Sequence, residues 1–246
     1  MRRELRYRKA LLGASSLAVT AVMLSSCVGD SGAAVTVAPE ELIGPGEVSY
    51  TVVVIGDSIS TGYQTSAEDA WPTRLEQKMT AQGIPLTLIN AAEDGAGYLV
   101  EGSGGKTFQQ QAEASVPSNA NAVIVYGSEN DIGYQLGKIN LEVEATAAAV
   151  KQRAPQADLL VVGPASYSSE VNPDLLTIRD QIKQGAQSAG ADFIDPIAER
   201  WIMDDESELI GPDGDHPSIE GHIYLEQKFE ALLQPLLHPI GESTGD

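Results

Sequence analysis

The stretch T-V-V-V-I-G-D-S, residues 51–58, carries most of the information about the fold of this chain. Thr51–Ile55 is a short run of β-branched, mostly apolar residues without alternation, which predicts a strand buried on both faces. Gly56 ends the run, and Asp57 and Ser58 favour a turn or the start of a helix. A buried strand that ends in a tight turn is typical of a parallel sheet covered by helices.

Similar strands recur along the chain, and helical patterns separate them. The predicted strands cover residues 51–55, 85–91, 122–126, 158–162 and 192–194, and the predicted helices cover 71–82, 108–115, 141–153, 173–189 and 218–233. Strands that alternate with helices form βαβ units, whose right-handed crossovers place helices on both faces of the sheet. We therefore expect an α/β fold, a three-layer α/β/α doubly wound arrangement around a five-stranded parallel sheet. We find no internal repeat and no second domain.

Composition narrows the range of functions. The 246 residues include 15 basic and 35 acidic side chains, which gives a formal net charge of −20. Nucleic-acid binding needs a basic face that displaces counterions from phosphate, so we expect no nucleic-acid partner. The single cysteine excludes an intramolecular disulfide framework and a cysteine-rich zinc site. No apolar run reaches the roughly 18 residues of an ordinary transmembrane helix.

The start of the chain has the pattern of a secretory signal. Five of the first nine residues are basic, and a small, apolar run, Ala10–Leu24, leads into L-S-S-C at 24–27. This ending resembles a bacterial lipobox. We therefore expect residues 1–26 to be a lipoprotein signal peptide and Cys27 to be the lipid attachment site. The alternative is an ordinary signal peptide with a chance cysteine.

The remaining boundaries follow from composition. Residues 27–49 predict a flexible tether, residues 50–237 the folded domain, and residues 238–246 a disordered tail. Cleavage after residue 26 would remove five basic residues and one acidic residue and leave a net charge of −24. Anionic headgroups would repel such a chain, so the lipid would hold it on the extracytoplasmic face of the cell membrane. Secretion without an anchor is the alternative location.

Four polar or glycine-rich segments lie where parallel α/β folds gather functional residues, at the carboxyl ends of strands and in the loops beyond them. They are G-D-S at 56–58, N-A-A-E-D-G-A-G-Y at 90–98, G-S-E-N-D at 127–131 and G-P-D-G-D-H-P-S at 211–218. Each has a purely structural alternative: a helix cap, a flexible loop, a local turn, and a solvated or Ca²⁺-binding acidic turn. Functionally, the Ser58 hydroxyl could project into a crevice, and the Asn130 amide could donate to a developing oxyanion.

One of the three histidines has a carboxylate at a useful spacing. Asp213 precedes His216 by three residues within a Pro/Gly turn, which can fold the carboxylate onto the imidazole. Asp215 is the competing acid, but adjacent side chains usually diverge. His222 falls within the last predicted helix, and His238 lies near the C-terminus. If a histidine activates a serine in this chain, we expect it to be His216.

The four segments, in this order, resemble the sequence blocks of the SGNH/GDSL hydrolase superfamily. The stretch L-I-G-P-D-G-D-H-P-S-I-E-G-H at 209–222 is most similar to the secreted actinobacterial lipoprotein members of that superfamily. The resemblance covers residues 50–237 and implies the SGNH-hydrolase fold, which is flavodoxin-like. It also implies a catalytic triad and an oxyanion hole. The residues are Ser58, His216 and Asp213 for the triad, and Ser58, Gly95 and Asn130 for the oxyanion hole, with Gly97 as the alternative glycine.

The resemblance implies acyl transfer to a serine followed by hydrolysis, the reaction of a carboxylic-ester hydrolase (esterase or lipase) that needs no cofactor and no metal. Small acyl esters, glycans or glycolipids are the expected substrates of an expected monomer. With a sugar hydroxyl in place of water, the same residues would serve an O-acyltransferase; a deacylase of cell-envelope glycans or glycolipids is also possible. A non-catalytic, glycan- or partner-binding lipoprotein is the third hypothesis. A binding module would not need all four of Ser58, Asn130, Asp213 and His216.

Some residues depart from the common pattern or concern the substrate. Ser128 stands where many members of the superfamily have glycine. Glu93 and Asp94 are acids beside the predicted oxyanion hole, where they would disfavour anionic substrates. Four aromatic residues belong to loops near the predicted crevice: Tyr63, Tyr98, Tyr134 and Trp201. For Trp201 we expect ordinary, half-buried packing.

Overall fold

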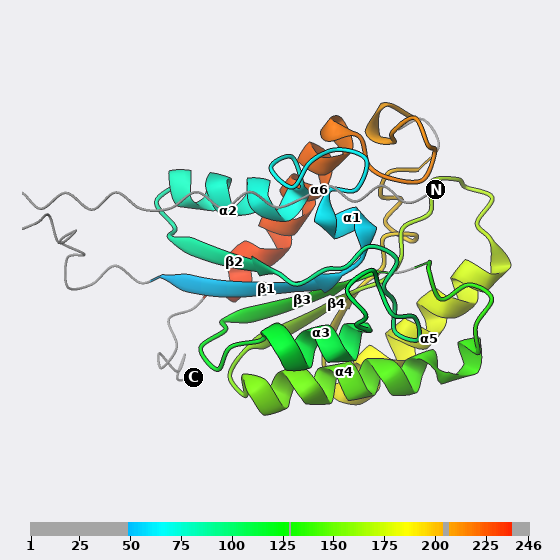
Figure 1. Ribbon diagram of the computed structural model, residues 1–246, viewed down its shortest axis with the longest axis horizontal. Helices are drawn as coiled ribbons and strands as arrows, with labels where there is room; N and C mark the ends of the chain where they lie inside the picture. Colours follow the sequence, from blue (N-terminus) through cyan, green and yellow to red (C-terminus); the bar gives the residue numbers. More distant parts are fainter. Residues whose placement is uncertain (1–48, 128, 204–206, 238–246) are drawn as a thin grey trace, which may run out of the picture. The chain divides into compact units, whose positions relative to one another are not determined.

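The computed structural model describes residues 49–127, 129–203 and 207–237 (Figure 1). The predicted signal peptide, Cys27, almost all of the predicted tether and the predicted tail lie outside the described residues, as does Ser128. Within the described part, no helix is both long enough and apolar enough to cross a membrane.

Strands and helices alternate along the described chain. The strands are β1 (Tyr50–Gly56), β2 (Leu86–Asn90), β3 (Ala122–Tyr126), β4 (Asp158–Val162) and β5 (Asp192–Ile194). The α-helices are α1 (Ser58–Thr61), α2 (Trp71–Ala81), α3 (Phe108–Ser115), α4 (Ile139–Arg153), α5 (Pro173–Ala189) and α6 (Ile219–Leu233). Short 3₁₀ turns lie at η1 (Leu136–Lys138), η2 (Ser207–Leu209) and η3 (Gln234–Leu236).

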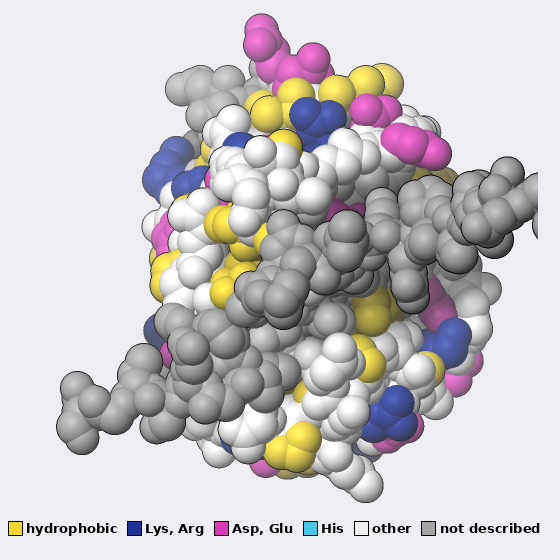
Figure 2. Space-filling model, turned by 90° about the vertical axis from the view of Figure 1, so that its left-hand side faces the viewer, with side chains coloured by type: hydrophobic (Ala, Val, Ile, Leu, Met, Phe, Trp, Pro, Cys, Tyr) yellow, Lys and Arg dark blue, Asp and Glu magenta, His cyan; other side chains and the backbone are white. Residues whose placement is uncertain are grey.

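The five strands form one parallel sheet in the order β2-β1-β3-β4-β5. The chain passes from β1 to β2 on one side and then returns to β3 on the other side of β1. The direction of winding therefore reverses at β1, which in α/β sheets marks the place where ligands bind, beyond the carboxyl ends of the strands. Figure 2 faces the opposite end, where β1 begins, and no histidine side chain is visible on the part that grey atoms leave uncovered.

Helices cover both faces of the sheet, so the predicted three-layer α/β/α fold is confirmed (Figure 1). Alternate residues of β1 serve the two cores. Val53 and Ile55 belong to the core shared with α3, α4 and α5. Val52 and Val54 belong to the core shared with α2 and α6. All four side chains are fully buried, which explains why the strand is continuously apolar.

The short helix α1 places Ser58, and the sequence indicated a turn or a helix start here without predicting the bounds of a helix. Its N-cap is Asp57, whose carboxylate accepts the Ile59 N–H at 2.9 Å. Its C-cap is Gly62 with φ +84°, where a Cβ would lie 2.2 Å from the Ser66 carbonyl oxygen, so only glycine fits. Asp57 is therefore a helix cap, which was the structural alternative considered for the G-D-S segment. Ser58 is the first residue of the helix.

The other predicted elements agree with the structure to within two residues. Helix α4 begins at Ile139, two residues earlier than predicted, because this fully buried side chain belongs to the core. Helix α6 begins at Ile219, since Ser218 is its N-cap and accepts the Gly221 N–H at 3.1 Å. The three 3₁₀ turns carry no periodic pattern in the sequence and were not predicted.

Candidate active site

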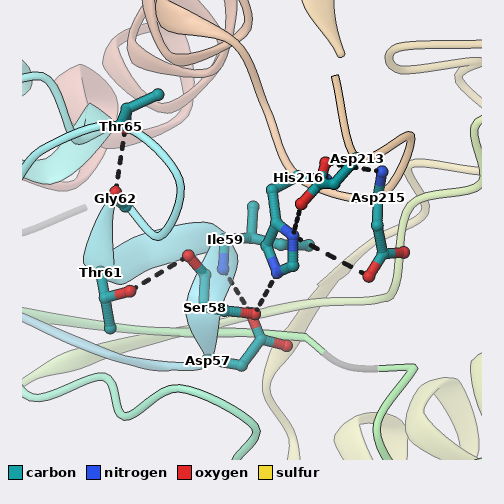
Figure 3. A network of polar contacts seen from close by, with 9 residues as sticks. All are labelled: Asp57, Ser58, Ile59, Thr61, Gly62, Thr65, Asp213, Asp215 and His216. Carbon is teal, nitrogen blue, oxygen red and sulfur yellow. Dashed lines mark hydrogen bonds and ion pairs between the residues drawn. The ribbon is translucent and has the colours of Figure 1, made fainter. Parts of the chain in front are cut away.

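The structure brings three of the predicted site residues together beyond the carboxyl end of β1 (Figure 3). The Ser58 Oγ and the His216 Nε2 are 3.0 Å apart. The His216 Nδ1 and the Asp213 Oδ2 are 2.7 Å apart on the other side of the ring. Ser58 and His216 are 158 positions apart in the sequence. The resulting chain of hydrogen bonds can move a proton from the hydroxyl to the imidazole while the carboxylate orients the ring.

A tight turn folds Asp213 back onto His216. The Asp213 Oδ1 accepts the N–H groups of Asp215 and His216, each at 3.1 Å, and Gly214 adopts φ +76°. The Gly211 N–H donates to the His216 carbonyl at 2.7 Å and closes the loop. Asp215, the competing acid, has its nearest carboxylate oxygen 3.9 Å from His216 Nδ1. The geometry thus favours Asp213 as the partner of His216.

Hydrogen bonds set the ionisation of Asp213. Partial desolvation acts to raise the pKa of its carboxyl group, but the N–H of Asp215 and the ring and N–H of His216 outweigh it. The pKa of Asp213 therefore lies below its usual value. The carboxylate stays charged across the neutral pH range, where it can stabilise a protonated His216.

The predicted oxyanion-hole residues lie at the same cavity. Gly95 lines it in the left-handed region at φ +74°, with open space where a Cβ would be. Gly97 differs, because its N–H donates to the Val100 carbonyl and a Cβ there would meet the Asp131 carboxylate at 2.6 Å. The geometry therefore favours Gly95 over Gly97. Asn130 also lines the cavity, and its Nδ2 donates to the Ala96 carbonyl at 2.8 Å.

The cavity has a volume of about 340 Å³ and an acidic wall. No Lys or Arg is among the described residues that line it. Those residues are Asp57, Ser58, Ile59, Tyr63, Asp94, Gly95, Glu129, Asn130, Asp215 and His216. Within the described ranges, no group of three or more His, Cys, Asp or Glu side chains is arranged to hold a metal ion.

The two acids of the second segment have different surroundings. Glu93 pairs with Lys106, whose Nζ lies 2.7 Å from its Oε1, and it is not among the cavity-lining residues. Asp94 lines the cavity and accepts the Thr61 hydroxyl at 2.5 Å. Of the two acids expected beside the oxyanion hole, only Asp94 lines the cavity. Lys106 pairs with Glu93 and not with Asp94.

Two further acids at the cavity were missed in the sequence. Asp57 is buried, and desolvation raises its pKa to about 7, although the Ile59 N–H and the charge of His216 oppose the shift. Burial raises the pKa of Glu129 to about 8, together with a hydrogen bond to Asp215 and the charges of Asp215 and Asp57. Their positions beside Ser58 and Asn130 are the only sequence signal that could have identified them.

The aromatic residues divide between cavity, core and surface. Tyr63 lines the cavity, and its ring centroid lies 4.7 Å from that of His216. Tyr98 is buried against Phe108, so its expected place near the crevice is wrong. Tyr134 is exposed and is not among the cavity-lining residues, and Trp201 is packed in the core as expected.

Comparisons with known proteins agree with this geometry. Residues 54–223 match the model of the GDSL-like lipase/acylhydrolase family. The chain belongs to this family. It is also 37% identical over 187 residues to the GDSL lipase Rv0518 of Mycobacterium tuberculosis (strain ATCC 25618 / H37Rv), covering 74% of this chain and 80% of the relative. Membership confirms the predicted SGNH/GDSL resemblance and makes the chain a GDSL-type serine esterase.

Two solved structures share its fold. The crystal structure of TesA superposes with a TM-score of 0.63 at 17% identity, covering 76% of this chain and 99% of TesA. The psychrotrophic esterase EstA from Pseudoalteromonas sp. superposes with a TM-score of 0.58 at 17% identity, covering 75% of this chain and 97% of EstA. At these identities the likeness concerns the fold, and the site of this GDSL hydrolase has to be argued from its own residues.

Proposed function

We propose that this GDSL hydrolase cleaves small, uncharged carboxylic esters through Ser58, His216 and Asp213, with an oxyanion hole formed by Ser58, Gly95 and Asn130. The observation that carries the proposal is the continuous hydrogen-bonded chain from Ser58 to Asp213 at the wall of an open cavity. The family and the cavity support the reaction class. The roles of the individual residues rest on their geometry.

In the acylation step, His216 Nε2 takes the proton of Ser58 as Oγ attacks the ester carbonyl carbon. A tetrahedral intermediate forms, and its oxyanion is stabilised by the N–H groups of Ser58 and Gly95 and the Asn130 amide. Each such donor typically lowers the barrier by about 3 kcal/mol. The intermediate collapses, the alcohol leaves with the proton from His216, and the acyl group remains on Ser58.

In the deacylation step, water replaces the alcohol. His216 accepts a proton from water as the oxygen attacks the acyl carbon, and returns it to Ser58 Oγ when the carboxylic acid leaves. Asp213 keeps Nδ1 protonated throughout, so that Nε2 is the nitrogen that exchanges the proton. No further group is needed for either step.

The charge and size of the cavity support an uncharged substrate. Asp94 and Asp215 lie in its wall, and a net charge of −20 surrounds it, so an anionic ester would be repelled on approach. A volume of about 340 Å³ suits a small acyl or sugar ester. We expect hydrolysis of acetate and butyrate esters to exceed that of palmitate esters.

The experiment is an assay of the full-length protein on p-nitrophenyl esters from acetate to palmitate, with Ser58→Ala alongside. We expect the substitution to lower kcat/KM by at least about a thousandfold, because it removes the attacking oxygen. Thr65→Ala is a matched control, since Thr65 belongs to the loop after α1 but does not line the cavity. Retained turnover in a folded Ser58→Ala protein would contradict the proposal.

The location of the enzyme is a separate part of the proposal. An acylated Cys27 would tether a monomeric enzyme to the extracytoplasmic face of the membrane. Mass spectrometry of the membrane-extracted protein should give a mature chain that begins at Cys27 and carries added acyl mass. Cys27→Ser should abolish that mass and release the protein from the membrane fraction, whereas an unmodified mature wild-type chain would rule out the anchor.

A further inference from the structure

Asp131 is a buried acid that the proposed mechanism does not use. It directly follows Asn130, and it is 0% exposed to solvent. Its two carboxylate oxygens accept two successive backbone N–H groups: Oδ2 accepts the N–H of Tyr98 and Oδ1 accepts the N–H of Leu99, each at 2.9 Å. Burying a carboxyl group is costly unless hydrogen bonds satisfy it, so these two bonds account for its place in the interior.

The two bonds join the segments that carry the two glycine and asparagine donors of the proposed oxyanion hole. We call residues 91–107 the Gly95 loop and residues 129–135 the Asn130 loop. Asn130 adds a third bond between them, because its Nδ2 donates to the carbonyl of Ala96 at 2.8 Å. Gly95 and Asn130 both line the cavity, whereas Asp131 is not among its described lining residues. Asp131 therefore holds the two loops together from behind the cavity wall.

Gly97 shows how closely the carboxylate fits the Gly95 loop. A Cβ at this position would lie 2.6 Å from the Oδ1 of Asp131 and 2.8 Å from its Cγ. The φ angle of Gly97 lies outside the left-handed region, so the backbone itself does not require glycine here. The carboxylate of Asp131 is what requires it. A larger residue at position 97 would push the carboxylate away from the two N–H groups that it accepts.

We propose that Asp131 is a positioning residue of the oxyanion hole: its carboxylate holds the Gly95 loop against the Asn130 loop and so sets the separation of the two donors. This inference rests on the proposed function, because it concerns donors to the same tetrahedral intermediate. Such donors are effective at about 2.7–3.1 Å from the oxyanion. A displacement of about 1 Å can lower the rate about a hundredfold, so the separation of the two loops matters for catalysis.

The first test is Asp131→Asn, which keeps the size of the side chain. Its amide nitrogen would replace one of the two oxygens and face a backbone N–H, so one hydrogen bond is lost. We expect kcat for p-nitrophenyl acetate to fall about tenfold to a hundredfold, with KM within about twofold of the wild type. The kcat is expressed per active site, counted from the p-nitrophenol that an uncharged phosphonate ester releases when it blocks Ser58.

The second test changes the contact from the other side. Gly97→Ala keeps every hydrogen-bonding side chain, but its Cβ displaces the carboxylate, so kcat should fall about tenfold. Asp131→Ala vacates that space, so the double variant Gly97→Ala/Asp131→Ala should have a kcat no lower than that of Asp131→Ala alone. Losses that multiply in the double variant would make the two residues independent and overturn the proposal. If Asp131→Asn does not fold, Gly97→Ala decides the test.

Asn121→Ala is the matched control for a buried side chain that accepts a backbone N–H. The Asn121 Oδ1 accepts the N–H of Thr51 at 2.9 Å, at the end of the sheet opposite the cavity. Loss of this bond should lower the free energy of unfolding but leave kcat per active site within about twofold. Urea unfolding of both variants separates the loss of stability from the loss of rate.

The outcomes separate this inference from the proposed function. If Ser58→Ala is inactive but folded Asp131→Asn keeps kcat within about twofold, the esterase mechanism stands and the role of Asp131 is refuted. A loss confined to KM, or an equal loss of kcat in Asn121→Ala, refutes it as well. If Ser58→Ala remains active, the proposed function fails, whatever the kinetics of the Asp131 variants.

Discussion

Two histidines only six positions apart have opposite surroundings in this enzyme. His216 lies in the loop before α6 with both ring nitrogens in contact with side chains, Ser58 on one side and Asp213 on the other. His222 lies inside α6 and is fully buried. Its Nδ1 accepts the Trp71 N–H at 3.3 Å, and its Nε2 has no hydrogen-bond partner among the described residues.

The difference shows what separates a histidine that can exchange protons from one that cannot. Burial lowers the pKa of His222 to about 4. The charges of Arg74 and His216 lower the pKa further, and the charge of Asp69 opposes the shift. His222 is therefore neutral at physiological pH and serves packing. His216 instead has a carboxylate beside Nδ1, the Ser58 hydroxyl beside Nε2 and an opening to the cavity, which is the arrangement that proton exchange needs.

The largest expected effect comes from removing each histidine in turn. His216→Ala should lower kcat about a thousandfold or more, with the free energy of unfolding nearly unchanged, because the ring lies at the cavity wall. His222→Ala should do the reverse. Loss of a buried ring and of the acceptor for the Trp71 N–H should lower the free energy of unfolding by about 2–4 kcal/mol. The folded fraction of this variant should keep near-normal kcat.

These two variants are measured by steady-state kinetics below the melting temperature and by urea unfolding. An active His216→Ala protein would remove the distinction between the two histidines. So would a folded but inactive His222→Ala protein, since it would give the buried ring a part in the reaction.

A smaller loss is expected when His216 loses only its carboxylate. Asp213→Asn keeps the size of the side chain but removes the charge that holds the correct tautomer, so kcat should fall about a hundredfold to ten-thousandfold. Asp215→Asn is the comparison, because its oxygen is 3.9 Å from the ring. We expect Asp215→Asn to lower kcat by less than about tenfold. Equal losses in the two variants would mean that Asp213 has no special role.

The buried His222 should make the free energy of unfolding depend on pH in the acid range. Because its folded pKa of about 4 lies below the unfolded value of 6.5, the unfolded chain binds more protons between these pH values. The free energy of unfolding is unaffected by this group above about pH 6.5 and decreases as pH falls through this window, and the loss reaches about 3 kcal/mol at about pH 4. Urea unfolding of the wild type and of His222→Gln at several pH values isolates it. Parallel curves for the two proteins would contradict the assignment.

The sequence was sufficient to predict that Ser58, Asp213 and His216 lie together, because the signals for these residues are local. Asp213 and His216 share one turn, and Ser58 directly follows a strand whose burial is evident from Val52–Ile55. The five-stranded parallel sheet was also predicted, because strands that alternate with helices form right-handed βαβ units. What these signals have in common is that each depends on residue type and spacing within a few positions.

Other features depend on contacts across the sequence. The cavity wall brings together Glu129 and Asp215 from segments 86 positions apart, and neither residue has a distinctive neighbour pattern. Tyr98 was expected near the crevice because it follows a glycine-rich loop, but its ring packs on Phe108 in the core. Glu93 and Asp94 are adjacent acids, and only the position of Lys106 distinguishes their charges. Such differences arise from tertiary packing, which local patterns do not encode.

The smallest expected effect concerns Tyr63, whose aromatic ring lies beside His216 in the cavity wall. Tyr63 is 44% exposed and lies at 4.7 Å from the imidazole, where it limits the motion of the base and covers one side of the ring. Tyr63→Ala should lower kcat about threefold to tenfold, the range expected for losing one aromatic contact. Tyr63→Phe keeps the ring and should retain wild-type kcat. If Tyr63→Phe instead raises KM as much as Tyr63→Ala does, the hydroxyl binds the substrate and the contact with His216 is incidental. Equal kcat in all three proteins would show that hydrogen bonds to Ser58 and Asp213 hold His216 without help from the ring.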